Sequence, residues 1–278
     1  MLKYECVSVK GKLNCFTLEV TMDTGILGQR DSGKEEIINV TFGLSRGTGK
    51  ILLDDMDVLS KKDSLFWTKI SVVFYDPMQL FNPIYDIASH FIEIGMSHGM
   101  EDEELVLETA KEILKILNVK DEVLNSYPNH LRTLELKKVA LALATFLEPE
   151  YLFVDDVEYN LSEEEIIHIV NSIIELKDTF GMKLVVFDND PAVLSRLAEY
   201  FVTLYRGEIV EEGYELLEYP LHPYTIDLLN KELREKNYEG NGCVYSLNCK
   251  FSSLKCKSIK PRLVNLGGKK VKCLGFPW

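Results

Sequence analysis

Strand and helix patterns alternate along most of this chain, and this alternation restricts its fold more than any other feature. Apolar, β-branched runs typical of buried strands occur at Ile70–Phe74, Tyr151–Asp155 and Lys183–Phe187. Amphipathic helical patterns lie between them, at Glu101–Leu117 and Leu131–Leu147. Strands that alternate with helices favour a mostly parallel sheet covered on both faces. We therefore expect an α/β fold.

The composition supports a large buried core and argues against nucleic-acid binding. The chain has 278 residues, of which 46% are hydrophobic, and this excludes disorder or a small disulfide scaffold as a description of the whole chain. The formal net charge is −13, so we expect no nucleic acid among its partners. Residues 241–278 differ from the rest because they hold seven Lys, one Arg and no acidic residue. This +8 segment predicts a separate C-terminal module.

The sequence lacks the patterns of a membrane anchor or an export signal. No stretch reaches the roughly 18–20 apolar residues that a membrane-spanning helix needs. The first residues, Met1–Glu5, lack the apolar core of a signal peptide. We therefore expect a cytosolic protein, in which disulfides are uncommon. Cys6 and Cys15 fall in N-terminal strand patterns and are expected to be small core residues.

A glycine-rich segment, Gly28–Glu35, follows a short strand pattern and precedes a predicted helix. It fits G-x-x-x-x-G-K, with Gly28, Gly33 and Lys34 at the fixed positions. In such a loop the backbone N–H groups and the lysine hold phosphates, and a final Ser or Thr hydroxyl binds Mg²⁺. This chain has Glu35 at the hydroxyl position, so the match is incomplete.

The carboxylate of Glu35 argues against a bound triphosphate. Two unit charges about 4 Å apart interact by about 4 kcal/mol at intermediate dielectric, and here the interaction is repulsive. Glu35 would instead suit the N-terminus of the following helix as an internal anion. An ordinary glycine-containing turn would show the same pattern.

Four cysteines near the C-terminus have the pattern C-x5-C-x6-C-x16-C. Four thiolates in a lysine-rich segment with little regular structure favour a metal centre. The spacing does not identify the metal, although structural zinc sites usually use tighter pairs. Four free thiols are the alternative. The candidate ligands are Cys243, Cys249, Cys256 and Cys273.

Two further segments suggest a family. The run Val72–Tyr85, VVFYDPMQLFNPIY, closely resembles the Q-loop region of oligopeptide/dipeptide ABC importer ATPases. The segment Leu221–Thr225, LHPYT, resembles the one that follows the ATPase core in that family. The cysteine pattern is also similar, and the resemblance covers nearly the whole chain.

The resemblance implies a RecA-like P-loop NTPase core of the ABC ATPase type, with an inserted helical subdomain and a small C-terminal module that holds a [4Fe–4S] cluster. It divides the chain into four parts. Residues 1–86 carry the N-terminal strands, the P-loop and the Q-loop, and residues 87–138 form the helical subdomain. Residues 139–212 complete the core, and residues 213–278 form the cluster module.

Carried over residue by residue, the nucleotide motifs of the family are eroded. Lys34 is kept as the phosphate lysine, but Glu35 replaces the Mg²⁺ hydroxyl and Tyr75 replaces the Q-loop glutamine. The signature segment, normally LSGGQ, aligns with Leu131–Glu135 and has lost its Ser and both Gly. Those glycines allow close backbone approach to a nucleotide, which side chains prevent.

The remaining catalytic positions are altered as well. The Walker B strand keeps its Mg²⁺-associated acid as Asp155, but Asp156 stands for the catalytic Glu. The loss of one methylene moves that carboxylate by about 1.5 Å, enough to misplace an attacking water. The switch histidine aligns with Asn189, which cannot relay a proton. Asp155 and Asp156 could also be solvated turn acids.

The resemblance implies a degenerate importer subunit at the cytoplasmic face of the membrane, with Mg-ATP weak or absent at its own P-loop. Its expected partners are a second, competent ABC ATPase, two transmembrane permeases and, indirectly, an extracytoplasmic solute-binding protein. The substrate class of peptides, nickel chelates or oligosaccharides stays open. Two alternatives remain, an active ATP-hydrolysing subunit of the same importer and a cluster-bearing redox or iron sensor of the transporter.

Overall fold

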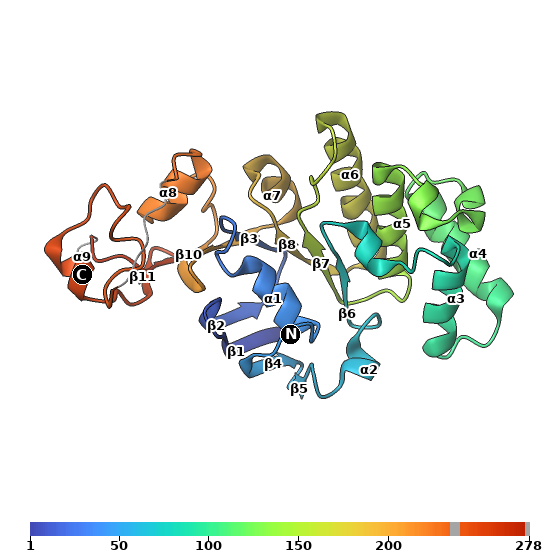
Figure 1. Cartoon of the computed structure of the whole chain (residues 1–278), viewed down its shortest axis with the longest axis horizontal. Helices are drawn as coiled ribbons and strands as arrows, with labels where there is room; N and C mark the ends of the chain where they lie inside the picture. The colour runs from blue at the N-terminus through green and yellow to red at the C-terminus, as the bar shows by residue number, and fades with distance from the viewer. Residues whose placement is uncertain (234–239, 276–278) are drawn as a thin grey trace. The chain divides into compact units, whose positions relative to one another are not determined.

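The computed structural model describes residues 1–233 and 240–275 (Figure 1). The chain forms two compact units. Unit 1 comprises Met1–Lys62 and Val186–Trp278, and unit 2 comprises Asp63–Val185. Part of the predicted C-terminal module lies outside the described residues, namely 234–239 and 276–278. The four-part division remains a prediction.

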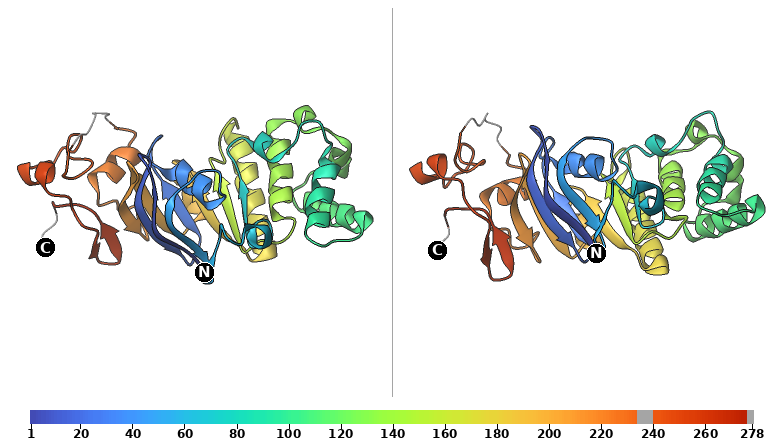
Figure 2. Two further views of the ribbon diagram at one scale, coloured as in Figure 1. Left: turned by 60° about the horizontal axis from the view of Figure 1, so that its bottom comes forward. Right: turned by 90° about the horizontal axis from the view of Figure 1, so that it is seen from below.

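The strands of unit 1 belong to two sheets. One sheet is antiparallel in the order β2-β1-β4-β5, and the blue N-terminal strands lie side by side in Figure 2. In the other, the order is β11-β12-β10-β9-β3, with β3 and β9 parallel and the remaining pairs antiparallel. The bounds are β1 Leu2–Val9, β2 Leu13–Val20, β3 Thr24–Leu27, β4 Thr48–Leu53, β5 Met56–Asp57, β9 Tyr200–Tyr205, β10 Glu208–Gly213, β11 Val264–Leu266 and β12 Lys269–Val271.

Four helices of unit 1 carry or adjoin the candidate sites. They are α1 Lys34–Thr41, α7 Pro191–Leu197, α8 Pro223–Leu229 and α9 Leu254–Ser258. The turn between β9 and β10 is Arg206-Gly207, and both residues have positive φ (49° and 76°), as a tight two-residue hairpin turn requires. This turn joins β9 and β10 into an antiparallel hairpin.

Unit 2 pairs two parallel strands, β6 and β7, and carries most of the helices. The short helix α2, Lys62–Leu65, starts at the last residue of unit 1, and the division between the units falls within β8, Lys183–Phe187. Helix α5 packs against β6 and α6, and its apolar residues are buried on nearly every side. The other bounds are β6 Ile70–Val73, η1 Pro77–Leu80, α3 Ile87–Ser97, α4 Glu103–Ile116, η2 Asp121–Asn125, η3 Pro128–His130, α5 Thr133–Thr145, β7 Tyr151–Asp155 and α6 Glu163–Phe180.

Helix α6 begins with a side-chain cap. Ser162 and Glu165 form a reciprocal capping box, which satisfies donors that a helix N-terminus otherwise leaves open. Gly181 ends the helix with φ +67°, a conformation that glycine adopts at low cost. In the described part of the chain, no helix combines the length and the apolar character needed to cross a membrane.

The expectation that Cys6 and Cys15 are core residues is wrong. Both side chains are exposed, and the two sulfurs form a disulfide across β1 and β2. Each residue has φ +48°, and the pairing register shifts between Tyr4 and Val7. This irregularity breaks the alternation of inward and outward side chains, so an exposed position falls where the strand pattern predicts a buried one.

Candidate functional site

The glycine loop lies between β3 and the first turn of α1, within unit 1. A Cβ on Gly28 would lie 2.4 Å from Oγ of Ser32 and 2.8 Å from the carbonyl oxygen of Leu204. Gly33 precedes α1 with φ +103°, and a Cβ there would lie 2.7 Å from a backbone oxygen of Lys12. Both positions therefore require glycine, as the loop pattern predicts.

Side chains of this chain satisfy the first backbone donors of the loop. The N–H of Gly28 donates to Oδ1 of Asn189 at 3.0 Å, and the N–H of Gln29 donates to Oη of Tyr224 at 2.9 Å. Asn189 is the residue that aligns with the switch histidine, so the structure brings these two predicted positions together. The amide oxygen of Asn189 therefore binds the backbone at the first residue of the loop.

The charged residues of the loop point in different directions. Lys34 is buried, whereas Glu35 is exposed on the first turn of α1. The buried carboxylate is that of the next residue, Glu36, which accepts a hydrogen bond from Nζ of Lys12 at 2.8 Å. Burial opposes ionisation of Glu36, but the hydrogen bond and charge of Lys12 hold its pKa below its usual value. The buried, paired carboxylate of this turn is therefore that of Glu36, which was not predicted from the sequence.

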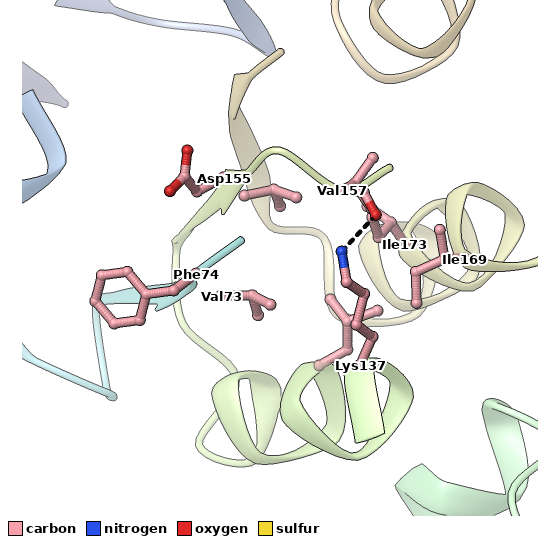
Figure 3. A pocket seen from close by; sticks show the side chains of 9 residues that line it. Val73, Phe74, Lys137, Asp155, Val157, Ile169 and Ile173 are labelled. Carbon is pink, nitrogen blue, oxygen red and sulfur yellow. Dashed lines mark hydrogen bonds between the residues drawn. The ribbon is translucent and has the colours of Figure 1, made fainter. Parts of the chain in front are cut away.

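The Walker B residues lie at the end of β7, within unit 2. Asp155 is the last residue of the strand, and Asp156 follows with φ +42°. Nζ of Lys137, a side chain 3% exposed, donates to the carbonyl oxygen of Val157 at 2.8 Å and lies 3.4 Å from that of Asp156. Figure 3 shows this lysine reaching from α5 beside a small cavity of about 10 Å³ that Asp155 also lines. A buried ammonium group therefore holds the backbone just beyond the Walker B strand.

Lys137 was not predicted from the sequence. Its position in the sequence could have indicated it, because the residues around it in the helix, from Leu136 to Thr145, are nearly all apolar. A charged residue is rarely buried without partners, so such a lysine marks a polar contact inside the fold.

The structure brings the Q-loop and signature positions together in unit 2. Tyr75, Thr133 and Tyr159 line one concave surface of about 380 Å³. The rings of Tyr75 and Tyr159 meet edge to face at a centroid distance of 5.2 Å. Tyr75, which aligns with the Q-loop glutamine, is thus partly held by the segment after the Walker B strand. Thr133 is exposed at the start of α5, and its N-cap residue, Arg132, makes no side-chain cap.

The four C-terminal cysteines lie in unit 1, and none of them forms a disulfide. Cys243 is buried and the other three are partly buried. The N–H of Cys243 donates to the carbonyl oxygen of Cys256 at 2.7 Å, and the N–H of Gly275 reaches Sγ of Cys273 at 3.4 Å. The fold therefore gathers the four residues that the sequence pattern selects.

The thiols influence one another electrostatically. Burial, together with the nearby thiols of Cys273, Cys256 and Cys249, raises the pKa of Cys243 to about 11. Burial also raises the pKa of Cys249 and of Cys273. A positive centre would stabilise the thiolate forms that these surroundings disfavour.

Two lysines close to the cysteines in sequence are paired with carboxylates. Lys250 bonds to Glu232 at 2.7 Å, and Lys272 bonds to the buried Glu208 at 2.5 Å. Lys255 and Lys257 are exposed on and beside the cysteine segment. Lys250 and Lys272 are therefore already engaged by acidic side chains of this chain.

Comparison with known proteins decides the family. The family model described as ABC transporter matches residues 14–158, which is more than half of the chain. The chain belongs to the ABC transporter family. The cassette spans the glycine loop, the Q-loop position and the Walker B strand described above.

Curated relatives of this ABC protein are named as peptide transport subunits. It is 26% identical over 278 residues to the dipeptide transport ATP-binding protein DppD of Haemophilus influenzae, covering 90% of this chain and 84% of that protein. It is 29% identical to DppD of Caldanaerobacter subterraneus (88% and 84%) and 25% identical to the oligopeptide transport ATP-binding protein OppF of Salmonella typhimurium (90% and 83%).

Solved structures confirm the cassette fold. A nucleotide-free ATP-binding cassette from an ABC transporter superposes with a TM-score of 0.67 at 21% identity, over 82% of this chain and 97% of that one. CbiO1 from Clostridium perfringens superposes with a TM-score of 0.65 at 18% identity, over 77% and 88%. The α/β fold expected from the sequence, that of a P-loop NTPase of the ABC type, is therefore confirmed.

Proposed function

We propose that this ABC protein is a degenerate ATP-binding subunit of an oligopeptide/dipeptide-type importer, with little or no ATP hydrolysis of its own. The names of its curated relatives support the transport class. The observation that carries the loss of hydrolysis is Glu35, an exposed carboxylate on the first turn of α1 where the P-loop needs a hydroxyl for Mg²⁺. Its negative charge opposes a triphosphate instead of binding the metal.

Other contacts support the same conclusion. Asn189 at the switch position is bonded to Gly28 and cannot titrate. Asp156 at the catalytic position is one methylene shorter than Glu. Each change affects a different part of phosphoryl transfer: Glu35 affects metal binding, Asp156 the positioning of water, and Asn189 the polar switch.

The proposed assembly contains a second, competent ABC ATPase and two transmembrane permeases, and it works with an extracytoplasmic solute-binding protein. In it, this chain lies peripherally at the cytoplasmic face of the membrane and contacts the permeases through its helical subdomain. Its contribution is structural coupling, while turnover depends on the partner's nucleotide residues.

We also propose that Cys243, Cys249, Cys256 and Cys273 hold a [4Fe–4S] cluster. The resemblance of the cysteine pattern to that of peptide-importer ATPases supports a cluster. The N–H of Gly275 also donates to Sγ of Cys273 at 3.4 Å, and hydrogen bonds to sulfur are a usual feature of cluster sites. When bound, the cluster would supply a rigid cross-link between the four segments.

ATP hydrolysis by the assembled transporter tests the proposed function. The Lys34→Ala variant of this chain is expected to leave the turnover of the complex within about twofold of the wild type. The matched control is the same substitution at the P-loop lysine of the partner ATPase, which should abolish turnover. Loss of turnover on Lys34→Ala in this chain would favour the active-subunit alternative.

The cluster has its own test. Anaerobically purified protein should show broad visible absorption and about four iron and four sulfide per chain, as the formula requires. Cys249→Ser should remove both, whereas Cys6→Ser should not. Stoichiometric zinc without visible absorption would contradict the proposal.

A further inference from the structure

One buried tyrosine joins the cysteine module to the glycine loop. Tyr224, in the first turn of α8, is fully buried. Its Oη accepts the N–H of Gln29, the second residue of the loop, at 2.9 Å. Removal of this acceptor would leave a backbone donor of the loop without that bond, and such a loss costs free energy because the contact is part-buried.

The backbone of Tyr224 is connected through His222 to the segment that holds the last cysteine. Its N–H donates to Nδ1 of His222 at 3.1 Å. Since Nδ1 accepts, the proton lies on Nε2, and the ring makes a second hydrogen bond to the backbone of Lys272, the residue before Cys273. Glu211 fixes the same turn, because it accepts the N–H groups of Leu221 and His222 at 2.7 and 2.9 Å.

The ring of Tyr224 packs against β9 and against the segment that holds the first two cysteines. Its centroid lies 4.5 Å from that of Tyr205, on β9, and 5.3 Å from that of Tyr245, in the cysteine segment. Tyr245 stands between Cys243 and Cys249, and its backbone oxygen accepts the N–H of Cys249 at 3.0 Å. Its hydroxyl donates to Asp227 of α8 at 2.5 Å. The backbone of Tyr224 and part of the packing of its ring therefore depend on segments that carry candidate ligands.

These segments have little regular structure of their own. Within residues 240–275 the only regular elements are α9, of five residues, and β11 and β12, of three residues each. Small segments of this kind usually need a metal or a disulfide to stay ordered. A group bound to the four cysteines would supply that order, and its loss would free the residues that pack on Tyr224.

We propose that Tyr224 is a positioning residue that fixes the first turn of the glycine loop, and that a group bound to the four cysteines keeps Tyr224 in place. The cysteine centre then controls the order of the loop from outside the nucleotide motifs. This coupling rests on the proposed metal centre, whereas the role of the Tyr224 hydroxyl does not.

Amide hydrogen exchange of the full chain tests both parts. In the metal-loaded protein, Tyr224→Phe should raise the exchange rate of the Gln29 amide by about three- to tenfold, the effect of one lost hydrogen bond. Visible absorption should be unchanged. Tyr214→Phe is the matched control, because Tyr214 is half-exposed and packs on Tyr200 away from the loop. Unchanged exchange in Tyr224→Phe would overturn the positioning role.

The coupling is tested by anaerobic removal of the bound group with a chelator. The amide exchange rates of residues 28–32 should rise by at least threefold in the stripped protein. In that stripped protein, Tyr224→Phe should raise the exchange rate of Gln29 by less than it does in the loaded protein. Equal protection in loaded and stripped protein would overturn the coupling. A purified chain that holds no metal would overturn it as well, together with the proposed cluster, while the Phe variant would still decide the role of the hydroxyl.

Discussion

Replacing Lys137 tests how the Walker B end of unit 2 is held. Its ammonium group donates to the carbonyl oxygen of Val157 at 2.8 Å, and both residues are buried, at 3% and 5% exposure. A hydrogen bond to a charged group contributes about 1.5–3 kcal/mol, and a buried carbonyl left without its donor costs a similar amount. These values describe the same loss, so they do not add. Methionine keeps the apolar stem of the lysine, so the substitution removes the ammonium group with little change in packing. Lys137→Met is therefore expected to lower the free energy of unfolding by about 2–3 kcal/mol.

Thermal unfolding followed by circular dichroism measures this effect. For a chain of this size, 1 kcal/mol corresponds to a change of about 2–4 °C in Tm, so Lys137→Met should lower Tm by roughly 4–12 °C. The matched control is Lys115→Met on α4, an exposed position where the change should stay within about 0.5 kcal/mol. If Lys137→Met is as stable as the wild type, the ammonium group does not hold the backbone beyond β7.

Three further predictions concern the loop and a helix end. The depressed pKa of Glu36 means that its ionised form stabilises the fold above the unfolded pKa of about 4.3, and that this contribution is lost as pH falls. Urea midpoints should therefore fall more steeply from pH 5 to 3 in the wild type than in Glu36→Gln. Equal slopes would contradict the pairing with Lys12. Gly28→Ala should lower the unfolding free energy by about 1–3 kcal/mol, because its Cβ would overlap Ser32, and an unchanged urea midpoint would show that the loop can adapt. Ser162→Ala should cost about 1 kcal/mol in thermal unfolding, and no loss would mean that the capping box contributes nothing.

Local patterns predicted most of the elements around the site. The buried strand that becomes β7, the capped start of α6 and the β9–β10 turn depend on residues close together in sequence. The glycine requirement of the loop is also local in part, since Gly33 needs positive φ. Such features follow from backbone geometry and hydrophobic periodicity, which a single sequence displays directly.

Partners far apart in the sequence could not be predicted. Asn189 lies 161 residues from Gly28, and Tyr224 lies 195 residues from Gln29, so neither hydrogen bond leaves a pattern in the chain. Alignment with the ABC motifs gave Asn189 a position but no partner. For the same reason the sequence pattern placed the anion of this turn at Glu35, since only the fold shows that Lys12 reaches α1 and pairs with Glu36.

Titration of Mg-ATP into the isolated, full-length chain is the most direct test of the lost nucleotide function. Calorimetry should show no saturable binding below about 1 mM (about −4 kcal/mol), since a carboxylate replaces the Mg²⁺ hydroxyl. Micromolar binding that disappears in Lys34→Ala and is strengthened little by Glu35→Ser would contradict the account, because the loop would then hold a triphosphate as it stands.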